Sequence, residues 1–236
     1  GLAATDPEEV ERMRTTIASL VELAHPQVLE FAGCCSVSGL TVLFDLPSYG
    51  TLRTVLDRGD VLVNSMQRER VLIDVSLAME FLDAYETAAT MVTSSSVFVT
   101  ATLGARVCAT GMLLNGGFGD RTQSGGQLSD VLLRWGAPEL LAHGGSALPT
   151  AACGVWSFGV LMWELFQEEP DTTVPYGDLT TDELRTAAAS NGGRPALLAP
   201  STLSELCKTV FASCQIRSPP ARPSMNGVAT LLVDEL

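Results

Sequence analysis

Basic side chains are scarce in this sequence. Its 236 residues include 14 lysines and arginines against 27 acidic residues, which gives a formal net charge of −13, and Lys208 is the only lysine. Nucleic-acid phosphates and anionic membrane surfaces are both bound by clustered basic residues. We therefore expect no nucleic-acid partner and no attraction to an anionic membrane.

Long apolar runs are missing as well. The most apolar stretch, residues 155–166 (VWSFGVLMWELF), is shorter than the roughly 20 residues that span a membrane, and it contains Glu164. We expect a buried helix there and no direct membrane insertion. The first residues also lack the basic start and the apolar run of a signal peptide.

Patterns of metal ligands are absent too. The six cysteines include no C-x-x-C pair and the sequence has only two histidines, so we expect no zinc site. Cysteines in this pattern favour a reducing compartment. We expect an intracellular, cytoplasmic protein, and a place within a longer or membrane-anchored protein stays open.

Strand-like patterns precede helical ones along the chain. Apolar runs predict strands at 28–33, 40–46, 96–100 and 105–108. Helical periodicity predicts helices at 6–25, 66–85, 155–166, 181–190, 203–213 and 224–236, with a short one near 52–56. Gly, Ser, Asn and Gln predict a long loop at 111–130. This order indicates an α+β fold.

A series of motifs in the second half of the chain resembles a known family. The motifs are RWGAPE at 134–139, VWSFGV at 155–160, WEL at 163–165, PYGDL at 175–179, NGGR at 191–194 and RP at 222–223. In this order they resemble the C-terminal part of protein kinases, with the character of tyrosine kinases and of the related tyrosine kinase-like group.

The resemblance implies a protein kinase-like fold with a mainly helical large lobe and a truncated small lobe. Residues 1–47 are then the remnant of the small lobe, and residues 48–236 are the large lobe. The glycine-rich loop and the lysine that hold ATP in kinases precede the helix with which this chain begins, so no cofactor is expected. The hinge remnant consists of Asp45, Leu46 and Pro47, with Phe44 at the gatekeeper place.

The resemblance also locates the catalytic positions. Protein kinases use a catalytic-loop Asp as base, and an Asn and a second Asp as magnesium ligands. Met91, Ser96 and Ala109 stand at these three places. Ala89 begins the loop where the family has His, and Thr16 stands where the small-lobe helix has an ion-pairing Glu. None of these side chains is charged, so we expect no catalytic residue and no metal site.

Two charged residues are expected to hold the scaffold together. The resemblance implies a buried ion pair between Glu139 and Arg222. The Asp that holds the catalytic loop in kinases is replaced by Gly154, so we expect a loosely held loop at 89–96. The serines at 94–96 within it are expected to be solvated.

These features predict a catalytically inactive kinase-like domain, or pseudokinase, that serves signalling as a protein-interaction or allosteric module. Its expected partner is a protein, such as an active kinase or a scaffold. Two alternatives stay open. One is a divergent tyrosine or serine/threonine kinase, using Mg-ATP, whose ATP-binding lobe is missing from this chain. The other is a decayed or mispredicted gene product without a function of its own.

Overall fold

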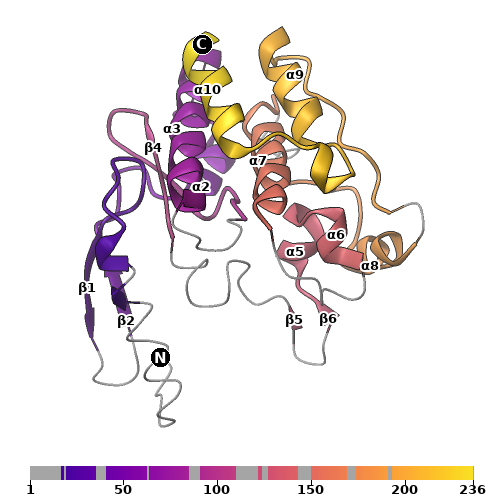
Figure 1. Ribbon diagram of the computed structural model, residues 1–236, viewed down its shortest axis with the longest axis horizontal. Coiled ribbons are helices and arrows are strands. Elements are labelled where there is room, and N and C mark those ends of the chain that lie inside the picture. The colour runs from indigo at the N-terminus through magenta and orange to yellow at the C-terminus, as the bar shows by residue number, and fades with distance from the viewer. Residues whose placement is uncertain are drawn as a thin grey trace.

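The computed structural model shows helices grouped beside small two-stranded sheets (Figure 1). It describes residues 17–18, 20–35, 41–62, 64–84, 91–109, 122–123, 127–142, 150–168, 174–190 and 193–235. The strands in these ranges are β1 (Phe31–Cys35), β2 (Thr41–Phe44), β3 (Val97–Val99), β4 (Ala105–Val107), β5 (Thr122–Gln123) and β6 (Gln127–Leu128). The helices whose bounds lie in these ranges are α2 (Leu52–Arg58), α3 (Ser65–Ala84), α5 (Asp130–Trp135), α6 (Pro138–Leu141), α7 (Ala151–Leu165), α8 (Thr181–Ala189), α9 (Glu205–Cys214) and α10 (Met225–Glu235), with a 3-10 helix at Pro219–Ala221. The predicted α+β class is confirmed.

The described strands pair as antiparallel hairpins. In the β1–β2 hairpin, Phe31 pairs with Phe44 beside a bulge in β1. Their rings meet edge to face, with 6.3 Å between the ring centroids. Val28 instead forms a parallel bridge to Val107 of β4. The predicted strand at 28–33 is therefore split, because its first part joins β4 and only its second part enters β1.

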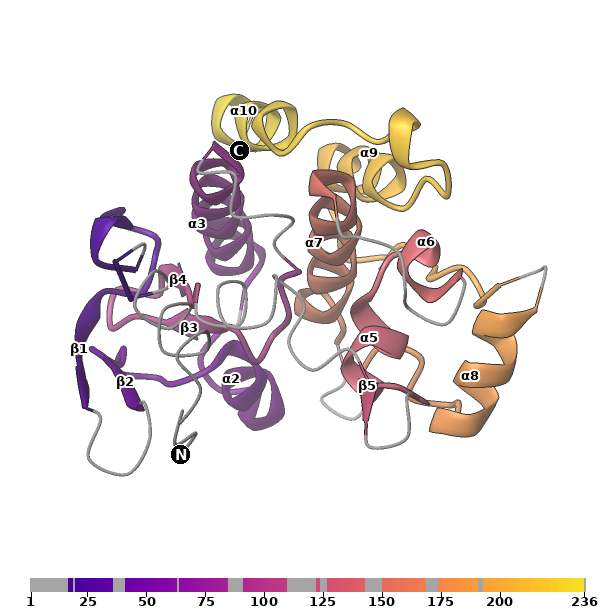
Figure 2. The ribbon, with the colours of Figure 1, turned by 60° about the horizontal axis from the view of Figure 1, so that its bottom comes forward.

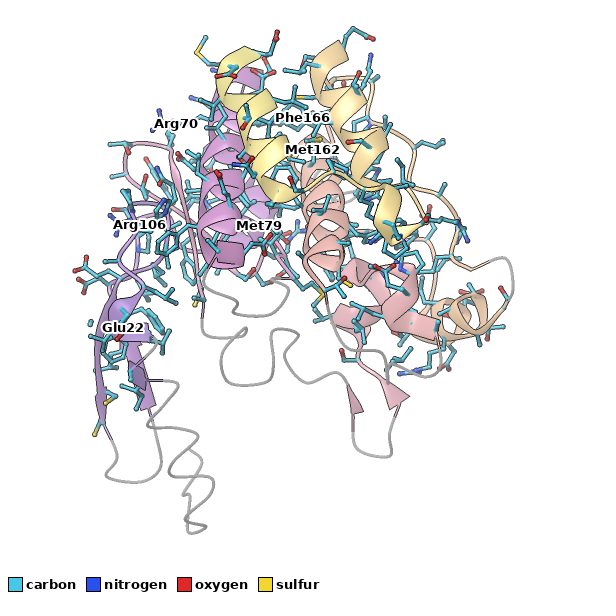
Figure 3. All side chains as sticks on the ribbon, in the orientation of Figure 1. Glu22, Arg70, Met79, Arg106, Met162 and Phe166 are labelled. Atoms are coloured by element: carbon cyan, nitrogen blue, oxygen red, sulfur yellow. The ribbon has the colours of Figure 1, made fainter. Side chains whose placement is uncertain are left out.

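The long helices α3 and α7 form the centre of the molecule (Figure 2). Most residues of α7 are buried, which confirms the buried helix predicted at 155–166, with an earlier start at Ala151. Figure 3 shows Met79 of α3 together with Met162 and Phe166 of α7 and its C-cap, all buried in one core. In the described part of the chain, every helix is too short or too polar to cross a membrane.

Two apolar cores flank α7. One lies between α7, α3, α9, α10 and the β3–β4 hairpin, and the other lies between α7, α5, α6 and α8. Figure 2 shows α3 on one side of α7 and the helices of the second core on the other. Each fully buried aliphatic or aromatic side chain contributes about 1.5–3 kcal/mol. These cores are therefore the main source of stability.

Helices α5 and α6 are too short for the sequence periodicity to predict them. Ser129 caps α5 by accepting a hydrogen bond from the amide of Leu132 at 3.2 Å, and Pro138 begins α6. The turn between them requires Gly136, because a Cβ there would meet the carbonyl oxygen of Leu132. The prediction of a loop at 111–130 is wrong toward the end of that range, where β5, β6 and the start of α5 lie. The rest of that range lies outside the described residues.

An ion pair between Glu139 and Arg222 joins segments that are far apart in the sequence. The two guanidinium nitrogens Nη1 and Nη2 lie 2.6 and 2.8 Å from the two carboxylate oxygens. Burial alone would raise the pKa of Glu139, but the hydrogen bond and charge of Arg222 hold it below its ordinary value. The same guanidinium also donates to the carbonyl oxygens of Ala152, Ile216 and Arg217. The pair therefore fastens α6 to the start of α7 and to the segment after α9.

Replacement of Glu139 tests this role. The side chain of Arg222 is 0% exposed, so Glu139→Ala leaves a buried charge without its partner and should lower the free energy of unfolding by about 3 kcal/mol. The matched control is Glu205→Ala, which breaks an exposed ion pair with Lys208 and should cost at most about 1 kcal/mol. Urea unfolding followed by circular dichroism measures both. Equal losses in the two variants would contradict the prediction.

Candidate functional site

The β3–β4 hairpin brings together two of the positions that the kinase resemblance singles out. Ser96 precedes β3 and Ala109 follows β4. The strands are antiparallel, with Val97 paired to Val107, and the amide of Cys108 donates to the carbonyl oxygen of Ser96 at 2.8 Å. Ser96 and Ala109 therefore lie at the same end of the hairpin.

Asp74 holds this hairpin against α3. Its Oδ2 accepts the amide of Ala105 at 2.8 Å, and its Oδ1 accepts Nε of Arg70 at 3.2 Å. The approach is close enough to require Gly104, because a Cβ there would lie 2.7 Å from Asp74 Oδ2. A buried acidic residue thus fixes the place of the hairpin and of the two positions at its end.

The side chains at the three positions that the resemblance assigns to catalysis are buried or hydrogen-bonded within the fold. Met91 is 9% exposed and belongs to the apolar cluster that contains Trp135. The hydroxyl of Ser96 donates to the carbonyl oxygen of Thr93 and accepts the amide of Thr93, both at 3.0 Å. Ala109 is buried. The three positions therefore hold a thioether, an occupied hydroxyl and a methyl group, and none of these is a carboxylate.

The predicted hinge remnant follows β2. Phe44 is half-buried and packs against the main core. The amide of Asp45 donates to the carbonyl oxygen of Glu30 at 3.3 Å, and the carbonyl oxygen of Pro47 accepts a hydrogen bond within the next turn. Leu46 is 71% exposed. The two remaining predicted positions, Thr16 and Ala89, lie outside the described residues.

A fully buried carboxylate, that of Glu164 in α7, contacts the segment before β3. Its Oε1 accepts the hydroxyl of Ser94 at 2.6 Å, and its Oε2 accepts the indole Nε1 of Trp135 at 2.7 Å. The guanidinium nitrogen Nη1 of Arg53, in α2, lies 3.5 Å from Oε1. One side chain thus joins α2, the segment before β3, α5 and α7.

Burial has a large effect on the protonation of Glu164. It raises the pKa to about 7, although the hydrogen bonds from Ser94 and Trp135 and the charge of Arg53 act in the opposite direction. The carboxyl group therefore exchanges its proton near neutral pH. The strength of the contacts that meet at Glu164 depends on pH in the same range.

The described part of the predicted catalytic loop, 91–96, is firmly held, and the prediction of a loose loop is wrong there. The hydroxyl of Ser157 accepts the amide of Val92 at 3.0 Å and donates to the carbonyl oxygen of Gly154 at 2.8 Å. Ser94 is 0% exposed, so its predicted solvation is also wrong. Ser157 and Glu164, both on α7, restrain the loop although position 154 has no side chain.

Sequence reasoning missed the Glu164 network. A signal was present, because an acidic residue within an apolar helical stretch must be paired or neutralised when it is buried. The sequence does not say which groups pair with it, because Ser94, Trp135 and Arg53 come from three other segments of the chain.

The helices packed around α7, the β3–β4 hairpin and the ion pair of Glu139 with Arg222 define a protein kinase-like domain. Residues 2–232 match the family described as protein tyrosine and serine/threonine kinase. The chain belongs to this family, and the resemblance seen in the sequence is confirmed.

Three relatives show the range of similar proteins. The chain is 30% identical to ephrin type-B receptor 6 of Homo sapiens over 171 residues, which are 72% of the chain and 15% of the receptor. It is 27% identical to the scaffold protein ILK of Mus musculus over 231 residues, which are 95% of the chain and 46% of that protein. It is 26% identical to the megakaryocyte-associated tyrosine-protein kinase of Rattus norvegicus over 220 residues, which are 93% of the chain and 44% of that protein. The chain thus spans less than half the length of each.

The protonation of Glu164 leads to a test by pH. Its pKa is raised from 4.5 to about 7 in the folded chain, so between these values the folded chain binds more protons than the unfolded chain. The free energy of unfolding should therefore fall as the pH rises through this window, by on the order of 3 kcal/mol. Glu164→Gln should remove this part of the fall, as measured by urea unfolding at successive pH values.

Asp83→Asn is the matched control for this test. Burial raises the pKa of Asp83 to about 6, so this variant should flatten only the lower part of the curve and keep the fall near neutral pH. A Glu164→Gln curve that runs parallel to that of the parent chain would show that Glu164 does not titrate in this window.

Proposed function

We propose that this chain is a catalytically inactive kinase domain, a pseudokinase, that acts in signalling as a protein-interaction or allosteric module. One observation carries the proposal: Met91, Ser96 and Ala109 stand where the family has a base and two magnesium ligands. We also propose that residues 1–47 correspond to the small lobe and residues 48–236 to the large lobe.

Phosphoryl transfer depends on charges held in position, with little covalent chemistry for the protein to do. A thioether at position 91 cannot take a proton from a substrate hydroxyl, and the methyl group of Ala109 offers no oxygen to magnesium. The hydroxyl of Ser96 is occupied on both sides by Thr93. In the described ranges, no group of three or more His, Cys, Asp or Glu side chains could hold a metal ion. These features support a domain without metal-assisted transfer.

The charged residues that remain support a role as a scaffold. The ion pair of Glu139 with Arg222 and the contacts of Glu164 hold α5, α6 and the segment before β3 in place. A framework that keeps its shape without the chemistry is suited to presenting surfaces. One relative is named a scaffold protein. We therefore propose a protein partner, such as an active kinase or another scaffold.

The setting proposed for this role is intracellular and cytoplasmic. The six cysteines, all within the described ranges, form no disulfide with one another, which suits a reducing compartment. The net charge of −13 favours protein partners over nucleic acid, whose phosphates repel an acidic surface.

A divergent protein kinase is the second candidate. It is favoured by the relative named as a tyrosine-protein kinase. In this candidate the ATP-binding lobe is missing from this chain, so Mg-ATP must bind once that lobe is restored. The pseudokinase proposal has no such requirement, and nucleotide binding by the extended chain separates the two.

Millimolar Mg-ATP is expected to leave the melting temperature unchanged, both for the purified chain and for a chain extended by the missing lobe. A ligand at about 100 times its Kd would stabilise the folded state by about 2.7 kcal/mol, and would raise the melting temperature by about 5–10 °C for a chain of this size. Differential scanning calorimetry with and without magnesium measures the effect, with an active kinase as positive control. A magnesium-dependent rise would favour the kinase candidate.

A further inference from the structure

An open groove lies between the first turns of α3 and the turn that joins β3 to β4. None of the positions that the resemblance assigns to catalysis lines it. Its volume is about 390 Å³, within the range of about 300–1,000 Å³ that is usual for ligand sites. Figure 3 shows Arg70, one of the lining residues, on the side of α3 nearer to the β3–β4 hairpin.

The groove has an apolar lining that reaches the surface. Ile73 of α3 and Leu103 of the turn are half-buried and pack against the main core. Met66, at the start of α3, is 78% exposed. Met66 and Ile73 are seven residues apart and therefore share one face of the helix. Exposed methionines suit a peptide-binding surface, because the flexible thioether side chain adapts to the shape of its ligand.

The turn holds Leu103 in a conformation that is unfavourable for this residue type. Its φ is 60°, in the left-handed region that glycine and asparagine adopt far more readily than leucine. The amide of Leu103 donates to the carbonyl oxygen of Thr100 at 3.0 Å, and the amide of Gly104 donates to the hydroxyl of Thr100 at 3.1 Å. These bonds fix Leu103 beside the groove. Backbone strain of this kind clusters at ligand-binding segments.

One acidic side chain of the lining has no partner. Glu69 lies three residues after Met66 and is half-buried, so it is reached from solvent. Within the described ranges its carboxylate accepts no hydrogen bond and forms no ion pair. Burial therefore raises the pKa of Glu69 without an opposing contact. A cationic group beside this carboxylate would supply the missing partner.

The basic residue of the lining is already paired within the chain. Nε of Arg70 lies 3.2 Å from Oδ1 of Asp74, and Oδ2 of the same carboxylate accepts the amide of Ala105. The charge of Arg70 is therefore offset, whereas that of Glu69 is not. The net charge of −13 also attracts basic segments to the chain at longer range. Both observations favour a ligand that brings positive charge to the groove.

We propose that this groove binds a peptide segment of a protein partner in which a Lys or Arg side chain lies next to aliphatic side chains. The aliphatic side chains contact Met66, Ile73 and Leu103. The basic side chain pairs with the carboxylate of Glu69 in a charge-assisted hydrogen bond. That the ligand belongs to a protein rests on the proposed function, whereas its chemistry rests only on the residues of the groove.

Both parts of the ligand are needed. An ion pair at an exposed groove contributes little by itself, because solvent and salt screen it. Apolar contact supplies most of the affinity, and the charge selects the partner. A peptide that combines basic and aliphatic side chains should therefore bind more tightly than a peptide that has only one of the two.

The methyl signals of the seven methionines provide a direct test by NMR. The probe is a peptide of sequence RLSLR with blocked ends. One control, ELSLE, reverses its charge, and the other, RSSSR, removes its aliphatic side chains. We expect RLSLR to shift the signal of Met66, which is identified by its loss in Met66→Ser. The signal of Met79, which is on the same helix but only 1% exposed, should stay in place.

Matched variants, measured by isothermal titration calorimetry, locate the binding. Glu69→Gln should weaken RLSLR binding about tenfold, which is the loss expected for one charge-assisted hydrogen bond. Glu22→Gln removes the same charge from an exposed residue that Figure 3 shows far from Arg70, and it should leave the affinity unchanged. Met66→Ser should also weaken binding, whereas Leu198→Ser, at an exposed residue outside the groove, should not. This second pair serves if Glu69→Gln does not fold.

Four results would overturn the proposal. They are a Met66 signal that RLSLR leaves unshifted, an equal shift with ELSLE or RSSSR, equal weakening by the two glutamate variants, and a dimer in light scattering that Met66→Ser abolishes. The last result would assign the groove to a second copy of this chain. The Mg-ATP measurement is independent of all four, so a failure of the peptide groove is distinguishable from a failure of the pseudokinase proposal.

Discussion

The architecture around α7 depends on keeping one buried carboxylate satisfied. Glu164 is fully buried, and a buried charge without partners costs several kcal/mol. Ser94, Trp135 and Arg53 reduce that cost, and each comes from a different segment. These segments must therefore converge on α7 at one point. The places of the residues that flank Ser94, including Met91 and Ser96, follow from this convergence.

Other charged residues of this chain also hold distant backbone segments together. Asp74 fixes the β3–β4 hairpin through the amide of Ala105, and Arg194 and Arg222 each bind several carbonyl oxygens. Protein kinases hold magnesium with an Asn and an Asp at the places that the resemblance assigns to the end of this hairpin. The charged residues named above serve the framework.

Much of the fold could be predicted because the signals are local. The apolar run at 155–166 and the periodicity at 66–85 predict α7 and α3 from neighbouring residues alone, and the RWGAPE motif indicates the family. Helices α5 and α6 are too short to show periodicity. The serines at 94–96 have the composition of a solvated loop, yet Ser94 is buried, because its exposure is decided by Glu164 and not by its neighbours in sequence.

The sequence by itself determined which chemical groups are missing. No folding can place a carboxylate at Met91 or Ala109, so the lack of acidic side chains at these positions follows from residue identity alone. Only the tertiary structure decided the environment of Glu164 and the meeting of Met66, Glu69 and Leu103 around one groove. The physical reason is that burial, charge pairing and hydrogen-bond satisfaction depend on neighbours from distant segments, which a linear sequence does not specify.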